Sequence, residues 1–146
     1  MRLINISNKM SYKLFTLNNI QAPNFLMTPL ELKDYLDFEV KRVYFISNPT
    51  GDTGNHAHRA EEDELFVQIQ GSSTICVDDG SGLKDIKLEG LKTAIYVPHM
   101  VGHGFKELSS DCIILALTST NYDPTRADYV EDYLEFKQLC KNQVSS

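Results

Sequence analysis

The chain has 146 residues, the length of one domain, which argues against a two-domain enzyme with its own cofactor domain. Hydrophobic residues make up 42% of it and charged residues 23%, a globular composition that argues against disorder. With 14 Lys and Arg against 20 Asp and Glu, the net charge is −6. This balance disfavours nucleic acid or an anionic membrane as the main partner, but it allows a local basic pocket for one anionic ligand.

The cysteines and the hydropathy pattern indicate a cellular compartment. Cys76, Cys112 and Cys140 are an odd number, lie far apart and form no CxxC motif, which disfavours a disulfide framework or a zinc–cysteine site. No apolar run approaches the roughly 20 residues that a membrane-spanning helix needs, and the first residues lack the apolar segment of a signal peptide. We therefore predict a cytoplasmic protein without a membrane partner.

The amino-terminal part of the single domain predicted over residues 1–146 carries few signals. Residues 1–12 are polar and weakly patterned, and we predict a loose extension there. Residues 13–17 fit a first short strand. The sequence TPLE at positions 28–31 has the pattern of a capping box with proline at the first helical position. It predicts a short helix over residues 29–36.

From residue 38 to residue 117 the sequence consists of short alternating runs separated by turns. In the clearest run, Leu65, Val67 and Ile69 fall on one face of an extended segment and Phe66 on the other. Strands are predicted over residues 40–46, 64–70, 73–79, 85–90, 93–98, 104–108 and 111–117. Such a series at close spacing predicts an all-β sandwich or barrel and disfavours βαβ units.

The spacing of the apolar residues changes again near the carboxyl-terminal end. Tyr129, Tyr133, Phe136 and Cys140 recur at intervals of three and four residues, which predicts an amphipathic helix over residues 127–141. We expect its aromatic stripe to pack against the barrel or against a partner, because such stripes usually face a core and not a ligand.

The strongest chemical signal is the sequence GNHAHR at positions 54–59. In an extended segment, residues two apart point to the same side, so His56 and His58 would project into one cavity. Two neighbouring imidazoles can hold a metal ion, or they can transfer protons because their pKa lies near neutrality. Taken alone, the motif is equally compatible with a surface turn that carries two incidental histidines.

The residues around this motif resemble those of a known family. The His-x-His segment is followed by acidic residues, a strand and Gly71, and later by Pro98 and His103. This order resembles the two motifs of the cupin family, although Met100 stands where the family prefers glycine. The resemblance implies a small β-barrel of the jelly-roll type, in agreement with the pattern of strands.

Within the cupins the chain resembles a narrower group over roughly residues 38–137. The runs HAHR, Gly-Ser at a strand end, Asp-Asp-Gly, Pro…His, Tyr-Asp and Asp-Tyr-x-x-Phe are similar to those of the nucleotide-sugar 3,4-ketoisomerases of the WxcM-like group. The resemblance implies that a dTDP-4-keto-6-deoxyhexose is converted to its 3-keto isomer by a homodimer that uses no metal and no cofactor. It implies His56 as the catalytic base, His58 as its catalytic neighbour and Tyr44 as a catalytic tyrosine.

The chemistry explains why such side chains suffice. The 4-keto group acidifies the proton at C3, its removal gives an enediol, and a proton returned at C4 leaves the ketone at C3. Because hydrogen moves only within the sugar, no redox cofactor is needed. One histidine can serve both proton transfers, while a tyrosine hydroxyl or a second imidazole stabilises the developing oxyanion.

Further residues are predicted to bind the substrate. Arg42 lies on the same strand face as Tyr44, and His103 is predicted to line the pocket. Arg59 has the opposite parity to the two histidines and is expected to face solvent, a partner chain or the nucleotide phosphates. Arg126 is a candidate to replace a basic group that the family carries at position 131, where this chain has glutamate.

Two alternatives stay open at this point. The first is a metal-dependent cupin enzyme whose ligands would be His56, His58, His103 and one glutamate. Glu62 has the expected spacing after His58, whereas Glu64 has the expected spacing before the glycine that follows the strand. The second alternative is a non-catalytic cupin that binds a nucleotide sugar.

Overall fold

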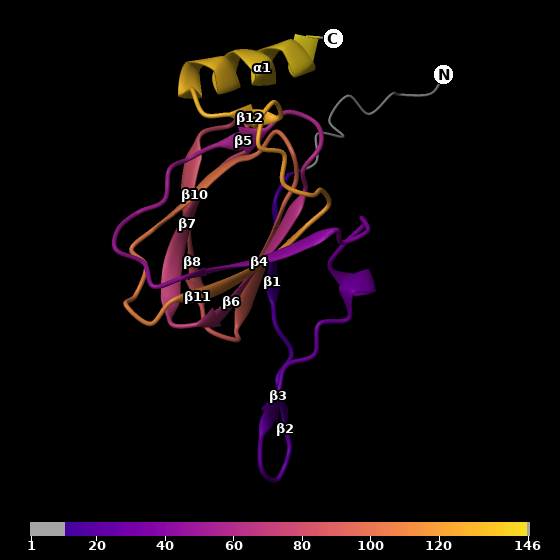
Figure 1. The fold of residues 1–146 in the computed structure, drawn as a ribbon, viewed down its shortest axis with the longest axis vertical. Coiled ribbons are helices and arrows are strands. Elements are labelled where there is room, and N and C mark those ends of the chain that lie inside the picture. Colours follow the sequence, from indigo (N-terminus) through magenta and orange to yellow (C-terminus); the bar gives the residue numbers. More distant parts are fainter. Residues whose placement is uncertain (1–10, 146) are drawn as a thin grey trace.

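The computed structural model describes residues 11–145 (Figure 1). Positions 1–10 of the predicted loose extension over residues 1–12, together with residue 146, lie outside the described part of the chain. The remaining two positions contact the rest of the chain: the Ser11 hydroxyl donates a hydrogen bond to Asp79, and Tyr12 packs against the main core. Among the described residues, no helix is both long and apolar enough to cross a membrane.

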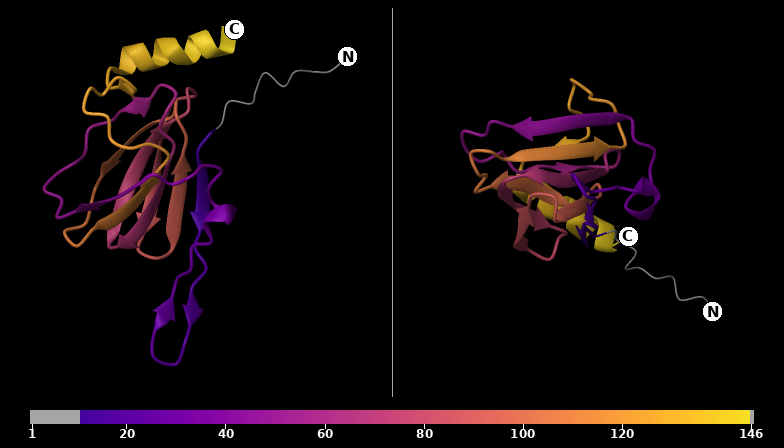
Figure 2. Two further views of the ribbon diagram at one scale, coloured as in Figure 1. Left: turned by 45° about the vertical axis from the view of Figure 1, so that its right-hand side comes forward. Right: turned by 90° about the horizontal axis from the view of Figure 1, so that it is seen from below.

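Two antiparallel sheets lie against each other (Figures 1 and 2). The five-stranded sheet has the order β1 (Lys13–Thr16), β9 (Thr93–Val97), β6 (Glu64–Gln70), β11 (Ile113–Thr118) and β4 (Arg42–Ser47). The three-stranded sheet has the order β10 (Gly102–Lys106), β7 (Ser72–Asp78) and β8 (Leu83–Glu89). All the strands expected from the alternating runs are present, with ends that differ from the expected ones by about two residues at most.

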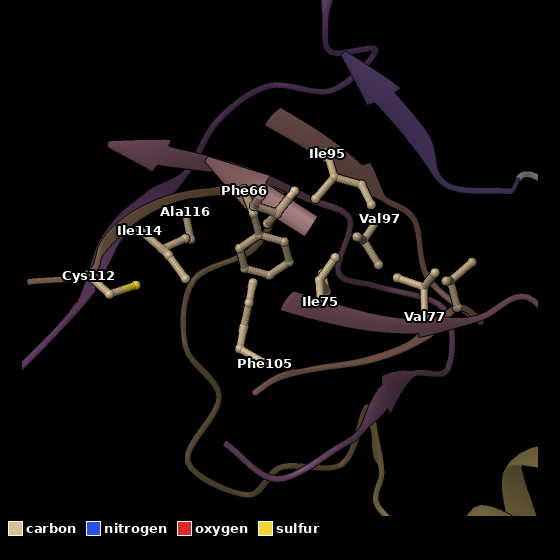
Figure 3. Close-up of a cluster of buried hydrophobic side chains, with 11 residues drawn as sticks. Phe66, Ile75, Val77, Ile95, Val97, Phe105, Cys112, Ile114 and Ala116 are labelled. Atoms are coloured by element: carbon tan, nitrogen blue, oxygen red, sulfur yellow. The ribbon is translucent and has the colours of Figure 1, made fainter. Parts of the chain in front are cut away.

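The main core fills the space between these sheets (Figure 3). Phe66 and Ile114 from the five-stranded sheet meet Ile75 and Phe105 from the three-stranded sheet. The rings of Phe66 and Phe105 pack edge to face, with centroids 5.1 Å apart. Full burial of side chains of this size stabilises a fold by roughly 1.5–3 kcal/mol each. The apolar packing between the sheets therefore supplies the rigid frame on which the polar residues described below are held.

The outer face of the five-stranded sheet is covered as well. Leu65 and Val67 of β6 are completely buried, although they point away from Phe66. They form a second cluster with Leu17 and with partly buried side chains from residues 30–40. Strand β6 is thus buried on both faces, and its inner face carries the buried polar side chains of Glu64 and Gln68 beside Phe66.

The predicted helix over residues 29–36 is reduced to one 3-10 turn, η1 (Leu32–Asp34). The Thr28 hydroxyl, expected to cap a helix, instead donates a hydrogen bond to Asn19, and no side chain caps η1. An eight-residue helix gains too little from its own hydrogen bonds to persist unless it buries a face. Here the chain instead runs across the outer face of the sheet, where Leu30 and Leu36 pack into the second cluster.

The carboxyl-terminal helix begins later than the predicted 127–141 and ends later, as α1 (Tyr133–Ser145). It starts at Tyr133 because the Asp132 side chain accepts a hydrogen bond from the backbone N–H of Glu135, a helix N-cap contact. Phe136 of its first turns is buried against the sandwich, as predicted for the aromatic stripe. Tyr129, which was expected on that stripe, belongs to a strand instead.

Two short strand pairs were not expected. β5 (Ala57–His58) pairs with β12 (Tyr129–Val130), which places the carboxyl-terminal segment beside the His-x-His motif, under α1 (Figure 1). β2 (Ile20–Gln21) and β3 (Leu26–Met27) form a hairpin that projects away from the sandwich (Figures 1 and 2). Two-residue strands are too short to show an alternating pattern, so the sequence gives no signal for them.

The turn between β6 and β7 allows a test of the fold. Gly71 has φ +72°, and a Cβ there would lie 2.2 Å from Ser109 Oγ and 3.1 Å from the Cα of Cys112. We expect Gly71→Ala to lower the free energy of unfolding by about 1–3 kcal/mol through left-handed backbone strain and this clash. Urea denaturation measures the change. Gly51→Ala is the control, because nothing lies within 4 Å of a Cβ at Gly51; equal losses for both variants would contradict the prediction.

Candidate active site

Three histidines converge at one end of the space between the sheets. His56 and His103 are joined by two backbone hydrogen bonds, with N···O distances of 3.0 Å and 2.9 Å, which fix their side chains as neighbours. The ring centroids lie 4.6 Å apart for His56 and His103 and 5.0 Å apart for His56 and His58. His58 and His103 are almost completely buried. The structure therefore brings together the two motif histidines and His103, as the sequence predicted.

Glu64, at the start of β6, lies at the centre of this cluster. Its Oε1 accepts a hydrogen bond of 2.8 Å from the hydroxyl of Tyr44, which comes from β4. Its Oε2 lies 3.1 Å from His103 Nε2 and 3.9 Å from His58 Nε2. Only 1% of the Glu64 side chain is exposed. This carboxylate thus connects the predicted catalytic tyrosine with two of the histidines.

Glu62 forms a second contact with His58. Its Oε2 lies 3.1 Å from His58 Nε2. Its Oε1 accepts hydrogen bonds from the hydroxyl of Thr120 at 2.6 Å and from Nη2 of Arg42 at 3.2 Å. The Arg42 guanidinium also lies over the ring of Tyr44, 5.0 Å from its centroid. Arg42 and Tyr44 therefore share one wall of the site, as their common strand face predicted.

Sequence reasoning missed the contribution of β12 to the site. The ring of Tyr129 stacks on that of His56 at 5.1 Å and 24°, and it meets His58 edge-on at 4.7 Å. Asp128 Oδ2 lies 3.5 Å from His58 Nδ1. The sequence Asp-Tyr at these positions was visible, but the predicted helix over residues 127–141 placed it away from the histidines.

Two of the predicted substrate-binding arginines have partners of their own. Arg59 forms an ion pair with Glu135 of α1, so its side chain points away from the cluster. Arg126 forms an ion pair with Glu131, and its guanidinium lies 3.8 Å from the ring centroid of Tyr129. Arg126 therefore borders the site through Tyr129, whereas Arg59 lies between the histidine loop and the helix.

The environment drives the pKa values of the two motif histidines apart. Burial, followed by the neighbouring His103 and His58, lowers the pKa of His56 to about 3. Burial also acts to lower the pKa of His58, but the close carboxylates of Glu62 and Glu64 outweigh it and raise that pKa. At neutral pH His56 is therefore a neutral imidazole, whereas the carboxylates make His58 a stronger base than a free histidine.

The neighbouring acid and phenol are also perturbed. Burial and the carboxylate of Glu64 raise the pKa of Tyr44, so its hydroxyl keeps its proton and acts as a donor. For Glu62, burial acts to raise the pKa, but His58 and the hydrogen bond from Thr120 lower it to about 2. Widely separated pKa values in one enclosed site are typical of acid–base chemistry.

Three cavities adjoin the histidine cluster. One of about 180 Å³ is lined by His58, Arg126 and Asp128, among others, and the other two are lined by His56. A cavity of about 100 Å³ lies between the sheets and is lined by Tyr44, Phe66, His56 and His103, among others. A second cavity of about 190 Å³ lies on the other side of the same two histidines, next to Phe136 of α1. His56 lines both of these cavities, so a small ring can reach it from the interior of the sandwich or from the side of the helix.

The same residues could hold a metal ion. His56, His58, Glu64 and His103 each offer one ligand atom, and these atoms lie within 4.8 Å of one another. Imidazole and carboxylate ligands of this kind suit first-row transition metals. Of the two acidic candidates, Glu64 and not Glu62 belongs to this group. In the described part of the chain, both ring nitrogens of His58, Glu64 Oε2 and His103 Nε2 approach partners of opposite charge but make no hydrogen bond, so they have capacity for a ligand.

Comparison with known proteins identifies the family. The model of the family described as "FdtA: WxcM-like, C-terminal" matches residues 10–141. The chain belongs to this family. It is 34% identical over 114 residues to the TDP-4-oxo-6-deoxy-α-D-glucose 3,4-oxoisomerase of Aneurinibacillus thermoaerophilus, a match that covers 77% of this chain and 80% of that enzyme.

Solved structures of other members have the same fold. The TDP-fucose 3,4-ketoisomerase of Campylobacter jejuni is 29% identical, with a TM-score of 0.79 over 91% of this chain and 98% of that one. The sugar 3,4-ketoisomerase of Thermoanaerobacterium thermosaccharolyticum, solved in complex with TDP, is 25% identical, with a TM-score of 0.80 over 91% of this chain and 96% of that one. The predicted all-β, cupin-type fold is confirmed.

The low pKa of His56 predicts how stability changes with pH. Folding lowers this pKa from 6.5 to about 3. Between these two pH values, the imidazole at position 56 therefore binds a proton in the unfolded chain but not in the folded chain. The free energy of unfolding therefore falls as the pH falls below 6.5, by at most about 1.4 kcal/mol per pH unit from this group. In His56→Asn we expect a shallower fall between pH 6.5 and 5.

Urea denaturation of chelator-treated protein at several pH values measures both slopes. His99→Asn is the control, because His99 contacts Asp63 outside the cluster. A slope in His56→Asn as steep as that of the wild type would show that His56 titrates normally in the folded protein.

Proposed function

We propose that this protein is a nucleotide-sugar 3,4-ketoisomerase that converts a dTDP-4-keto-6-deoxyhexose to its 3-keto isomer. The observation that carries the proposal is the pairing of a neutral His56 with a His58 of raised pKa, beside a cavity that His56 and Tyr44 line. The curated relative from A. thermoaerophilus is named as a 3,4-oxoisomerase of a TDP-4-oxo-6-deoxyglucose. A histidine-to-asparagine variant of the T. thermosaccharolyticum enzyme was solved with TDP-4-keto-6-deoxyglucose, which supports a histidine at the centre of the chemistry.

His56 is the base that moves the proton. Its depressed pKa leaves the imidazole free to accept a proton at neutral pH. It takes the proton from C3 of the sugar, which gives an enediolate with negative charge on the oxygen at C4. The imidazolium so formed is destabilised by burial, which favours return of the proton to C4. The bond to hydrogen at C3 breaks and one forms at C4, while the proton of the C3 hydroxyl passes to the oxygen at C4. The ketone thereby moves to C3 without oxidant or reductant.

His58, and not Tyr44, is the better group to stabilise the enediolate. The hydroxyl of Tyr44 already donates its single proton to Glu64. Two carboxylates raise the pKa of His58, and its ring centroid lies 5.0 Å from that of His56. A protonated imidazole at this distance lowers the energy of the negative charge that develops in the transition state. Tyr44 then serves to hold Glu64 and to form the wall of the cavity.

The diphosphate of the substrate is assigned to Arg42 and Arg126. Both guanidinium groups border the rings that enclose the histidines, Tyr44 and Tyr129 respectively. Nε of Arg42 is buried without a hydrogen-bond partner, so it can still donate a hydrogen bond to a ligand. Arginine binds phosphate in an oriented, bidentate manner. Substrate binding by Arg59 stays a prediction, because that residue pairs with α1.

A cytoplasmic location belongs to the same proposal. Cys76, Cys112 and Cys140 form no disulfide with one another in the described residues, and two of them are buried, as expected for a protein that folds in a reducing compartment.

Replacing the base tests this mechanism. We expect His56→Asn to lower kcat by at least about 100-fold on a dTDP-4-keto-6-deoxyhexose, the usual contribution of a positioned base, while the fold is kept. His99→Asn is the matched control and should keep the wild-type rate. NMR detection of the 3-keto product in deuterated buffer measures turnover and deuterium at C4 together. Normal turnover by His56→Asn would refute the assignment of the base.

The metal-dependent alternative is favoured by one observation, the four ligand atoms within 4.8 Å of one another. Under the proposed mechanism, wild-type enzyme dialysed against a chelator should keep its full rate. Elemental analysis and the rate are measured on the same sample. Stoichiometric iron, manganese, nickel or zinc, together with loss of the rate on removal and its recovery on addition, would favour the alternative.

We also propose that the enzyme is a homodimer held in part by the β2–β3 hairpin. Phe25, Leu26 and Met27 are 60%, 49% and 46% exposed on this projecting arm. A hairpin of two short strands is at best marginally stable in water without a surface to cover it. A second copy of the chain is the partner that would cover these apolar side chains in every molecule.

Phe25→Glu tests the role of the hairpin. We expect light scattering to give twice the monomer mass for the wild type and a shift toward the monomer for this variant, because a charge would be buried in the contact. Leu134→Glu is the control, since Leu134 is 79% exposed on α1. A monomeric wild type at micromolar concentration, or a dimer equally stable in both variants, would contradict the proposal.

A further inference from the structure

The short strand β12 joins the carboxyl-terminal part of the chain to the histidine loop. In the β5–β12 pair, Tyr129 lies opposite His58 and Val130 opposite Ala57. The carbonyl of Asp128 extends this pair by accepting a hydrogen bond of 2.7 Å from the backbone N–H of Arg59. Val130 is buried in a cluster with Ala57 and residues of α1, which anchors β12. The side chains of residues 128 and 129 are thus fixed relative to the motif.

The Asp128 carboxylate holds the turn that follows the motif. Its Oδ1 accepts a hydrogen bond of 2.9 Å from the backbone N–H of Ala60. The N–H of Glu61 lies 3.2 Å from both oxygens, and the N–H of Glu62 donates to Oδ2 at 3.2 Å. Consecutive backbone N–H groups around one carboxylate form a typical anion nest. The turn, and with it the position of Glu62, therefore depends on Asp128.

The same carboxylate also contacts the imidazole of His58. Asp128 Oδ2 lies 3.5 Å from Nδ1, and Glu62 Oε2 lies 3.1 Å from Nε2 on the other side of the ring. His58 is thus placed between two carboxylates, one on each ring nitrogen. Asp128 is itself the carboxylate beside Nδ1. Because it holds the turn, it also fixes the position of Glu62, whose carboxylate lies beside Nε2. A residue that served only to cap the turn would not need to approach the ring.

We propose that Asp128 is a positioning residue of the active site, which orients the ring of His58 and keeps a proton on its Nδ1 toward the carboxylate. The proposal rests on the proposed function, since it assigns His58 to the stabilisation of the enediolate. Asp128 itself does not touch the substrate. It acts through His58, in the way that a carboxylate holds the imidazole of other acid–base sites in one orientation.

Asp128→Asn removes the charge but keeps an oxygen that accepts backbone N–H groups. We expect kcat to fall about 10- to 100-fold, the range for partners that orient a functional imidazole, with KM changed by no more than about threefold. In ¹⁵N NMR spectra of the substrate-free protein, the ring signals of His58 should shift while those of His99 stay in place. Asp79→Asn is the matched control, because Asp79 also accepts a backbone N–H in a turn, that of Ser81, and lines neither cavity beside His56; it should leave kcat unchanged.

Three results would overturn the proposal. The first is a folded Asp128→Asn variant with kcat within twofold of the wild type and unshifted His58 signals. The second is an equal loss of activity in Asp79→Asn, which would indicate a general structural effect of replacing a carboxylate that holds a turn. The third comes from the wild type and holds even if the variant does not fold: a spectrum of His58 without a proton on Nδ1.

The NMR readouts need no substrate, so they separate this proposal from the proposed function. If the wild type turns over no dTDP-4-keto-6-deoxyhexose, the isomerase function fails, but a protonated Nδ1 that responds to Asp128→Asn still supports the positioning role.

Discussion

Charge balance in a buried space is the constraint on which the site depends. His58, Glu64 and His103 are almost fully buried between the sheets, where an unpaired charge is costly. The carboxylates of Glu62 and Glu64 raise the pKa of His58, and burial keeps His56 neutral. One arrangement therefore shifts the pKa values of two neighbouring imidazoles in opposite directions. A neutral base beside a more basic imidazole is the pair that the proposed proton shift between adjacent carbons uses.

The fold supplies this arrangement from distant parts of the chain. β4 contributes Tyr44, the start of β6 contributes Glu64, and β10 contributes His103, so the apolar core holds their relative positions. The loop histidines are fixed differently. His56 is bridged to His103 through the backbone, and His58 lies opposite Tyr129 in the β5–β12 pair. The carboxyl-terminal segment is therefore part of the active site as well as the connection to α1.

The sequence was sufficient for the strands and for the core of the site. The alternation of residues 64–70 predicts a strand. His56 and His58 were predicted to lie together because residues two apart in an extended segment share a face, whereas the resemblance to the cupins placed His103 beside them. Helix limits were less predictable. Residues 29–36 carry a capping pattern, but only one 3-10 turn forms there, because the segment packs on the sheet. Tyr129 pairs with β5 and therefore lies outside α1. The role of Asp128 depends on a contact between residues 66 to 70 positions apart, which no local pattern encodes.

The central claim is that His56 faces the reacting carbons of the sugar with no metal ion between them. A crystal structure of His56→Asn with a bound dTDP-4-keto-6-deoxyhexose tests it most directly. The account predicts that C3 and C4 of the hexose lie against the side chain at position 56, with the oxygen at C4 on the side of His58. A hexose bound outside the cavities that His56 lines, or a metal ion held by His58, Glu64 and His103, would contradict it.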